Sequence, residues 1–456
     1  MRLLLIGSGG REHALAWKFK QEDPSLELIA APGNPGIAQL GECVSISATD
    51  IEGLESLARD RAVDLTVVGP EASLALGVVD RFQAAGLPIF GPTKAAAEIE
   101  TSKAFSKQLM LEEGIPTARA EMHTDVREAK EAIRRFGAPV VVKASGLAAG
   151  KGVIVCSSIK EADRAVEDML QGNRFGAAGA EVLIEEFMEG EEISIFAISD
   201  GHSFTVLPGL QDHKRLLNGD LGANTGGMGA YFPVTLKDPT DPMATPGSDS
   251  GGYSVSLTMS ATLGVFAPTI RGLAARGRPF KGLLYAGLMI TADGPKVVEF
   301  NCRFGDPETQ ALMPVLGMRL LDLMVPISRG ERIFGYPADG VFGDVSLRTL
   351  FSYNVGPACV TTVLAAQNYP ESPRTGDIIT LAPPEENVFV FHAGTARNAD
   401  GLLVTAGGRV LAVSAVAPTI AEAQRKSLDH ARRITFAGKQ FRSDIGWREI
   451  ARQTRA

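Results

Sequence analysis

The chain has 456 residues, which is too long for a single hydrophobic core and predicts about three domains. Its hydrophobic content of 45% and charged content of 21% are typical of an ordinary soluble globular protein. The net charge of −8 argues against nucleic-acid binding through a basic surface, and no apolar run approaches the length that spans a membrane.

Four cysteines are scattered along the chain and form no CxxC pair: Cys43, Cys156, Cys302 and Cys359. They fit reduced, mostly buried thiols better than disulfides or zinc ligands. The start, MRLLLIGSGG, is interpreted as a first strand rather than a signal peptide, because glycines interrupt its short apolar stretch. We therefore expect a cytoplasmic protein that binds neither nucleic acid nor a membrane.

Four regions follow one another along the chain. Residues 1–122 alternate predicted strands and helices, which indicates a doubly wound parallel α/β domain. Residues 123–190 predict a small α+β unit, and residues 191–330 carry longer strands before a closing helix. Residues 331–456 predict a β-rich cap with a late helix. The Gly-, Ser-, Thr- and Pro-rich stretch 239–256 is interpreted as a mobile surface loop.

The N-terminal domain carries glycine-rich turns after its predicted strands. GSGGREHA, residues 7–14, joins a strand to a helix start and predicts an anion site. As a dinucleotide fingerprint it is incomplete, because Glu12 stands where the third glycine belongs and the next strand ends without an acid, so an NAD-dependent dehydrogenase is disfavoured. His13 is interpreted as structural or as a phosphate contact. PGNPG at 32–36 and GPE at 69–71 lie where open sheets bind ligands, although plain tight turns are the alternative.

The stretch VVVKASGLAAGKGVIV, residues 140–155, is an apolar strand that runs into a loop of small residues and lysines. Lys143 ends the strand, and Gly150, Lys151 and Gly152 follow. Backbone N–H groups and two ammonium groups predict a cover for a polyphosphate. A hairpin with a flexible tip and solvated lysines is the alternative. It is not a Walker loop, because Gly152 occupies the position that requires Ser or Thr.

Two polar segments follow the hairpin. VLIEEFMEGEEIS, residues 182–194, suits a crossover between two lobes in which a carboxylate accepts hydrogen bonds from ribose hydroxyls, and a solvated charge run is the alternative. Residues 211–231 have few apolar anchors and five glycines, and we interpret them as a substrate loop.

VVEFNCRFGDPETQ, residues 297–310, predicts a metal site. Glu299 and Asn301 are two apart on a strand and so share a face, where their oxygens suit Mg²⁺ held jointly with phosphates. Arg303 is expected on the same face, able to clamp an anion. Asp306-Pro307-Glu308 is interpreted as a helix cap with proline at the first helical position, and a cap without further function is the alternative.

Together these motifs resemble the glycinamide ribonucleotide synthetase family, which are ATP-grasp ligases of purine biosynthesis. The resemblance runs from Met1 to about Ile445 and rests on an ordered set of motifs: GSGGREHA, PGNPG, GPE, KASGLAAGKGV, IEEFMEGEEIS, QDHKR, NTGGMGAY and EFNCRFGDPETQ, with weaker matches at FHAGT, GGRVL and FRSDIG. It implies an N-terminal α/β domain (1–122), an ATP-grasp lid (123–190), an ATP-grasp central part (191–330) and a C-terminal domain (331–456).

The resemblance also implies site residues. The ATP-binding residues are Lys103, Lys143, Gly150, Lys151, Gly152, Glu185, Glu186, Phe187 and Glu192, with Glu185 to Phe187 as the adenine hinge and Glu192 as the ribose acid. The implied ligands of Mg²⁺ (or Mn²⁺) are Glu299 and Asn301. The residues implied around phosphoribosylamine or glycine are Gly9, Gly10, Arg11, Glu12, Gly33, Asn34, Asp212, Asn224, Gly226 and Arg303. Catalytic roles fall to Lys151, Arg303 and Asp212.

The implied reaction joins glycine to 5-phosphoribosylamine at the expense of ATP. The glycine carboxylate attacks the γ-phosphate, and the amine then attacks the resulting glycyl phosphate. Such chemistry needs positioning and charge neutralisation, and a closing lid excludes water. The expected state is a monomer, with a dimer as the alternative.

Some features depart from the family pattern. Residues 241–267 are longer and richer in Gly and Ser than the usual segment, and the strand LLYAGLMI carries no acid, so no third protein ligand for the metal can be named. One rival is another ATP-grasp ligase or carboxylase, against which QDHKR with NTGGMGAY argues. Another is a catalytically inactive nucleotide-binding regulator, against which Glu299 and Asn301 argue.

Overall fold

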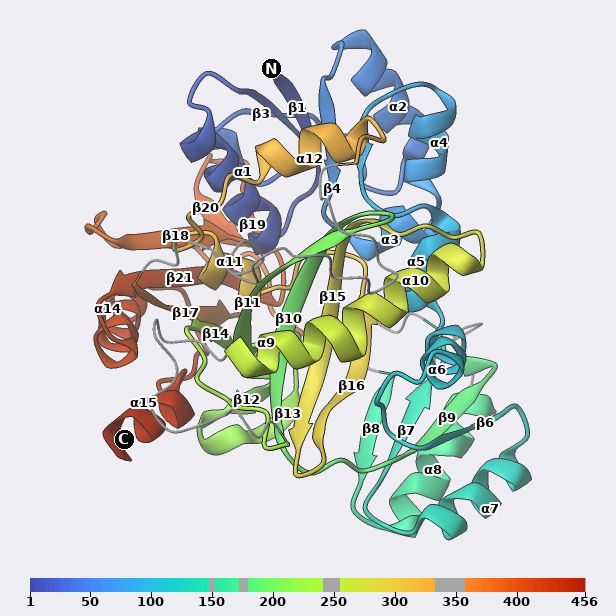
Figure 1. The fold of residues 1–456 in the computed structure, drawn as a ribbon. Coiled ribbons are helices and arrows are strands. Elements are labelled where there is room, and N and C mark those ends of the chain that lie inside the picture. The colour runs from blue at the N-terminus through green and yellow to red at the C-terminus, as the bar shows by residue number, and fades with distance from the viewer. Residues whose placement is uncertain (147–151, 172–178, 241–254, 333–356, 456) are drawn as a thin grey trace.

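The computed structural model describes residues 1–146, 152–171, 179–240, 255–332 and 357–455 (Figure 1). Within these residues the strands form one parallel sheet, one four-stranded sheet, one eight-stranded sheet and two short hairpins. No helix in this part of the chain is both long and apolar enough to cross a membrane.

The N-terminal region is a five-stranded parallel sheet with the order β3-β2-β1-β4-β5, which confirms the predicted doubly wound architecture. Its strands are almost continuously apolar because helices cover the sheet. The strands are β1 (Arg2–Gly7), β2 (Glu27–Pro32), β3 (Glu42–Cys43), β4 (Leu65–Val68) and β5 (Ile89–Phe90). The helices are α1 (Gly10–Glu22), η1 (Ile37–Gln39), α2 (Ile51–Asp60), α3 (Glu71–Ala75), α4 (Val78–Ala84), α5 (Lys94–Thr101) and α6 (Lys103–Glu112).

A smaller antiparallel sheet follows, with the order β6-β9-β7-β8. Helices α7 and α8 pack on it around an apolar cluster that includes Ile133, Val142 and Val166. Its strands pair β7 with β8, so the predicted hairpin is present, while its tip at 147–151 lies outside the described residues. The elements are β6 (Ala120–His123), α7 (Val126–Phe136), β7 (Val140–Ala144), β8 (Val153–Cys156), α8 (Ile159–Leu170) and β9 (Val182–Glu186).

The eight-stranded sheet has the order β16-β15-β10-β11-β14-β17-β21-β18. Because β14 pairs with β17, the strands of the C-terminal region continue the central sheet (Figure 1). The strands are β10 (Glu191–Asp200), β11 (Phe204–Asp212), β14 (Gly229–Phe232), β15 (Lys281–Thr291), β16 (Gly294–Asn301), β17 (Ala358–Ala365), β18 (Val388–His392) and β21 (Arg409–Ala417). The hairpins pair β12 (Arg215–Leu217) with β13 (Leu221–Asn224), around η3 (Asn218–Asp220), and β19 (Thr395–Arg397) with β20 (Leu403–Thr405). The later helices are α11 (Glu308–Leu312), α12 (Leu321–Ser328), α14 (Ile420–Arg433) and α15 (Trp447–Arg455).

A long helical segment that the sequence analysis missed lies across the central strands (Figure 1). It consists of α9 (Val255–Ala261), the π-helical η4 (Thr262–Phe266) and α10 (Ala267–Ala275), so residues 255 and 256, predicted as loop, are helical. Residues 241–254 lie outside the described part. Leu257, Val265 and Ile270 are buried from this segment, which explains why a stretch with so few charges is helical.

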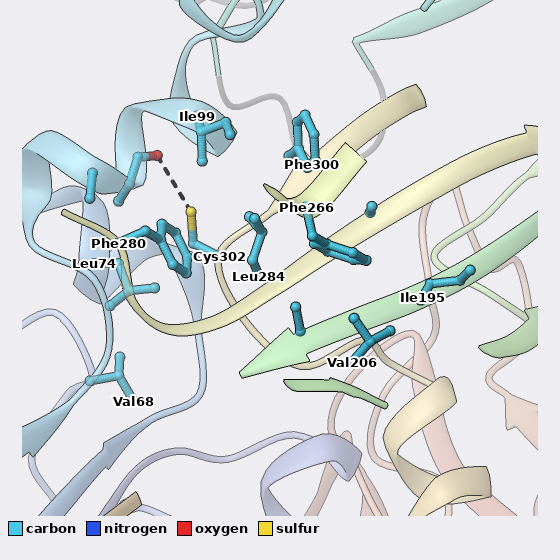
Figure 2. Close-up of a cluster of buried hydrophobic side chains, with 14 of the residues drawn as sticks. Val68, Leu74, Ile99, Ile195, Val206, Phe266, Phe280, Leu284, Phe300 and Cys302 are labelled. Atoms are coloured by element: carbon cyan, nitrogen blue, oxygen red, sulfur yellow. Dashed lines mark hydrogen bonds between the residues drawn. The ribbon is translucent and has the colours of Figure 1, made fainter. Parts of the chain in front are cut away.

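One hydrophobic core crosses from the N-terminal sheet to the central sheet. Figure 2 shows Val68 and Leu74 beside Phe280, Leu284 and other side chains of the central part. The Cys302 thiol at the centre of this view donates to the Ala97 carbonyl oxygen at 3.8 Å. The two regions therefore share their interior and hold each other in register.

The N-terminal domain is also fixed to the C-terminal strands through α1. His13 Nδ1 accepts the backbone N–H of His392 at 2.7 Å, and the Trp17 ring packs on Phe389 at 4.9 Å between centroids. The Asn34 amide donates to the His392 carbonyl at 2.9 Å. Burial lowers the pKa of His13 to about 3, and nearby His392 adds to the effect. His13 is therefore a neutral acceptor at this contact.

This buried imidazole makes stability depend on pH. The folded chain takes up the His13 proton near pH 3, whereas the unfolded chain takes it up near 6.5, so the contribution is complete above pH 6.5 and is lost as the pH falls. His13→Asn keeps an acceptor but removes this proton. We expect the wild-type free energy of unfolding to fall between pH 6.5 and 4 more steeply than the variant's, by up to about 1.4 kcal/mol per pH unit. Urea unfolding at several pH values measures it, with the exposed His202→Asn as control; equal slopes for His13→Asn and wild type would contradict the assignment.

Candidate active site

Two carboxylates meet where β10 begins and its antiparallel partner β11 ends. Glu192 is the second residue of β10, and Asp212 is the last of β11. Lys214 donates to the Glu192 carboxylate. Desolvation works against the charged Lys214, but the carboxylates of Glu192 and Asp212 outweigh it and raise its pKa well above the ordinary value. The structure thus brings Glu192 and Asp212 together around a lysine that the sequence analysis named only as part of a loop.

The surroundings of Asp212 raise the pKa of its carboxyl group. Burial raises its pKa to about 7, and the carboxylates of Glu308, Glu192 and Glu299 add to the effect, while Lys214 opposes it. Burial is the largest cause, and the carboxylates of Glu192, Glu299 and Glu308 lie close enough to Asp212 to act on it.

Glu299 and Asn301 lie at the end of β16, opposite Gly287 and Tyr285 of β15. The regular pairing of this stretch places the two side chains on one face, as predicted. Neither side chain forms a hydrogen bond or ion pair with the described residues, so both oxygens remain available. Burial would raise the pKa of Glu299, but Lys214, Lys143 and Lys103 together hold it below the ordinary value. Within the described ranges, no group of three or more His, Cys, Asp or Glu could hold a metal.

Lysines approach this face from the small sheet and from α6. Lys143 Nζ lies 2.5 Å from Glu185 Oε2 and 3.2 Å from the Val298 carbonyl, next to Glu299 in sequence. Lys107 Nζ lies 3.0 Å from Glu185 Oε1, and Lys103 Nζ donates to the Gly146 carbonyl at 3.1 Å. Lys107 was missed, although it follows Lys103 by one helical turn. Gly152 is described and buried, whereas Gly150 and Lys151 lie outside the described residues.

The expected adenine hinge has a more specific structure than the motif suggested. The Glu185 side chain is a buried counter-ion: burial would raise its pKa, but Lys143 and Lys107 hold it below its ordinary value. Glu186 binds Arg119 at 2.6 Å, and the Phe187 ring is exposed. The first two side chains are therefore committed within the protein, and what remains for a flat ligand is the backbone and Phe187.

The turn between β1 and α1 differs from the expected anion site. Glu12 Oε2 accepts the Gly9 N–H at 2.6 Å, and its other oxygen accepts Arg11 Nε at 2.6 Å. A Cβ atom on Gly69 would lie 2.0 Å from Glu12 Oε1, so the carboxylate fills the space beside this turn. The chain's own carboxylate therefore takes the Gly9 donor. Gly10 packs against the Gln310 amide.

The other residues expected at the substrate site differ in exposure and in the hydrogen bonds that they already form. Asn34 is saturated, because its amide donates to Ser8 and His392 carbonyls and its oxygen accepts from Gly36 and Ile37. Gly33 is in the left-handed region with a φ of 70°, against Cys43. Asn224 is exposed on β13, where it pairs with Arg215 of β12. The Gly226 carbonyl accepts from Arg409 Nη1 at 2.5 Å, and Arg409 also pairs with Asp306.

Arg303 lies two residues beyond the end of β16, and its charge is among those that lower the pKa of Glu299. Its guanidinium is 3.3 Å from Glu71 and 3.4 Å from Glu100, two acids of the N-terminal domain. Helix α11 begins at Glu308, so Pro307 precedes the helix rather than occupying its first position. The Asp306 carboxylate accepts the Gln310 amide at 2.8 Å and serves as a tether rather than an N-cap.

Several residues of the site escaped the sequence analysis: Glu100, Lys107, Tyr285 and Arg409. Glu308, interpreted there only as part of a helix cap, also belongs to the site. The Ser194 hydroxyl lies 2.9 Å from both the Tyr285 hydroxyl and Glu308 Oε1, which joins β10, β15 and α11. These contacts link residues 91 and 114 positions apart in the chain. Short motifs cannot reveal pairings over such separations.

The two neighbouring glutamates of β9 give a matched test of this geometry. Glu185→Gln leaves Lys107 and Lys143 without their buried counter-ion, so we expect a loss of about 3–5 kcal/mol in the free energy of unfolding. Glu186→Gln removes an ion pair whose arginine is exposed, so we expect about 0–1 kcal/mol. Urea unfolding of both variants measures the difference. Equal losses would show that Glu185 is not the buried counter-ion described.

Comparisons with known proteins agree with this architecture. Three models of the phosphoribosylglycinamide synthetase family match the chain: the N domain over residues 1–100, the ATP-grasp (A) domain over 101–309 and the C domain over 359–448. A phosphoribosylamine–glycine ligase from Xanthomonas campestris is 49% identical over 457 aligned positions, covering 99% of each chain.

Solved structures show the same relationship. The phosphoribosylamine–glycine ligase of Thermotoga maritima has a TM-score of 0.80 and 34% identity, covering 98% of this chain and 100% of its own. The biotin carboxylase domain of a Hydrogenobacter thermophilus 2-oxoglutarate carboxylase has a TM-score of 0.68 over 96% of this chain and 91% of that chain, but at 17% identity it shows the fold alone. Family models that cover most of the chain, together with a relative nearly half identical over its full length, show that it belongs to the phosphoribosylglycinamide synthetase family of ATP-grasp enzymes.

Proposed function

We propose that this chain ligates glycine to 5-phosphoribosylamine with ATP, giving glycinamide ribonucleotide, ADP and phosphate in purine biosynthesis. The observation that carries the proposal is the full-length relationship to phosphoribosylamine–glycine ligases. It is supported by lysines and carboxylates that converge on one face of the central sheet, as ATP-dependent acyl phosphate chemistry requires.

The reaction needs no covalent residue of the protein. A glycine carboxylate oxygen attacks the γ-phosphorus, and the bond from that phosphorus to the bridging oxygen of ADP breaks. The phosphoribosylamine nitrogen then attacks the acyl carbon, loses a proton, and phosphate departs with the electrons of the broken C–O bond. Lys103 and Lys143, which lie beside Glu299, are proposed to balance charge on the phosphates.

Other roles follow from position. Glu192 is proposed to accept hydrogen bonds from the ribose hydroxyls, and the backbone and ring at Phe187 to contact adenine. Arg303, held by Glu71 and Glu100, is proposed as the cation on the substrate side, with Asp212 near the reacting amine or carboxylate. Gly9 to Glu12 and the Gly33-Asn34 turn are proposed as walls of the phosphoribosylamine site. Gly150 and Lys151 keep their proposed role over the triphosphate, outside the described residues.

A divalent cation fits the oxygens of Glu299 and Asn301. Both groups are unpartnered within the described part of the chain, and their chemistry suits Mg²⁺ or Mn²⁺. Such an ion would supply charge neutralisation on the nucleotide phosphates.

The compartment and the oligomeric state complete the proposal. We propose a cytoplasmic enzyme, on the basis of its free cysteines, three of which are buried. We propose a monomer as its working state, to be checked by size-exclusion chromatography with light scattering.

The decisive experiment measures ADP release from ATP and Mg²⁺ with glycine, with phosphoribosylamine, and with both. Phosphoribosylamine is generated in the tube from phosphoribosyl pyrophosphate and ammonia. We expect release that requires both substrates, with glycinamide ribonucleotide formed in equal amount. ATP binding without such release would contradict the proposed acceptor and favour a different ATP-grasp ligase.

The metal assignment has its own test. Glu299→Ala removes a carboxylate that is proposed to bind the ion, so we expect at least a roughly ten-fold rise in the Mg²⁺ concentration for half-maximal activity. Asp293→Asn, at the exposed turn before β16, is the control and should titrate like wild type. Full activity of Glu299→Ala at low Mg²⁺ would overturn the assignment.

A further inference from the structure

The C-terminal helix α15 is bonded directly to β10, the strand that carries Glu192, and to β14, which is paired with the strand of Asp212. Its Arg452 Nη1 lies 3.0 Å from each carboxylate oxygen of Glu191, the first residue of β10. Its Nη2 donates to the Tyr231 hydroxyl at 3.3 Å and to Glu449 at 2.8 Å. One guanidinium therefore joins the helix to β10 and β14.

The contacts continue from Tyr231 toward the site. The Tyr231 hydroxyl donates to the Gln211 amide oxygen, and the Gln211 nitrogen donates to the Glu192 carbonyl at 2.7 Å. Tyr231 and Gln211 are 0% and 1% exposed, so each group would be costly to leave unpaired. The chain of bonds runs from Arg452 to the backbone of Glu192.

Strand alternation places this network behind the site. Glu191 and Gln211 each precede a site residue by one position, so their side chains point to the opposite face from Glu192 and Asp212. The network thus holds β10 and β11 from the face opposite the site. It does so next to Glu192, the proposed ribose carboxylate, and Asp212.

Helix α15 is itself firmly anchored. Glu449 is 0% exposed and accepts the Thr235 N–H at 3.1 Å and hydroxyl at 2.6 Å. Arg448 pairs with Asp220 at 2.5 Å, and the Gly446 N–H donates to His213 at 3.0 Å. A helix fixed in this way can hold the ends of β10 and β11 in place. The family model for the C domain ends at residue 448, before Arg452.

We propose that α15 is a positioning element for ATP binding, and that Arg452 is the residue through which it fixes the β10–β11 strand ends. Its side chain is committed to Glu191, Tyr231 and Glu449, so its effect on the nucleotide passes through Glu191, Tyr231 and Gln211. The inference rests on the proposed function where it takes Glu192 as the ribose carboxylate.

The test measures ATP binding directly, by calorimetric titration of full-length protein, so that it does not depend on ligase turnover. Arg452→Ala should raise the Kd for ATP by about five- to ten-fold. The KM for ATP should rise in step, while the kcat at saturating substrates stays within about two-fold and the KM for glycine is unchanged. Thr454→Ala is the matched control and should bind like wild type, because the Thr454 hydroxyl donates to the Ile450 carbonyl within α15.

Further Arg452 variants separate a positioning role from a loss of stability. Arg452→Lys keeps a charge beside Glu191 but cannot span both partners, so its Kd should fall between wild type and Arg452→Ala. Arg452→Gln serves as a second variant if the alanine form does not fold. A lowered melting temperature with an unchanged Kd for ATP in the folded variants would overturn the inference.

Discrimination between ATP and its deoxy analogues separates this inference from the proposed function. The ratio of Kd for 2′-deoxy- or 3′-deoxy-ATP to that for ATP should fall in both Glu192→Ala and Arg452→Ala. A fall in Glu192→Ala alone would overturn the positioning role. An unchanged ratio in Glu192→Ala would remove the proposed ribose contact, and the Kd of Arg452→Ala for ATP would then decide the positioning role by itself.

Discussion

The structure depends on balancing charges that are crowded around one face of the central sheet. Negative charge comes from four carboxylates: Glu192, Asp212, Glu299 and Glu308. Positive charge comes from three lysines: Lys103, Lys143 and Lys214. Removing a carboxylate or an ammonium group from water is costly unless opposite charge lies nearby, so the elements that carry these groups are held within reach of one another. This constraint explains why α6, β7, β9, β10, β11 and β16 converge although they come from distant parts of the chain.

The scaffold meets this constraint by sharing interiors. One apolar cluster spans the N-terminal and central sheets, and α1 docks on β18 through His13 and Trp17. Arg303 adds ion pairs to this packing, because its partners Glu71 and Glu100 belong to the N-terminal domain. The site is thus assembled from three regions whose relative positions are set by packing outside it.

Much of this could be predicted from the sequence. Continuous apolar strands separated by amphipathic helices identified the parallel sheet, and the alternation of β16 placed Glu299 and Asn301 on one face. What could not be predicted depends on long-range pairing. Glu185 was interpreted as part of the adenine hinge. Its side chain instead pairs with Lys107 and Lys143, which come from other elements. The helix over residues 255–275 was missed because Gly264, Pro268 and the polar run before it obscured the helical spacing of its apolar residues. Arg303 was placed on a strand that had already ended at Asn301.

The pairing of β14 with β17 has a consequence for how the chain can be divided. Family boundaries separate the ATP-grasp part, ending at residue 309, from the C domain, beginning at 359. The hydrogen bonds ignore that division, since a strand of one part is completed by a strand of the other. A fragment cut between them would expose the bare edge of β14 over Gly229–Phe232, an apolar row of unpaired backbone groups that invites other strands to add. The boundaries of the family models therefore do not coincide with the boundaries of the central sheet, which continues into the C-terminal strands.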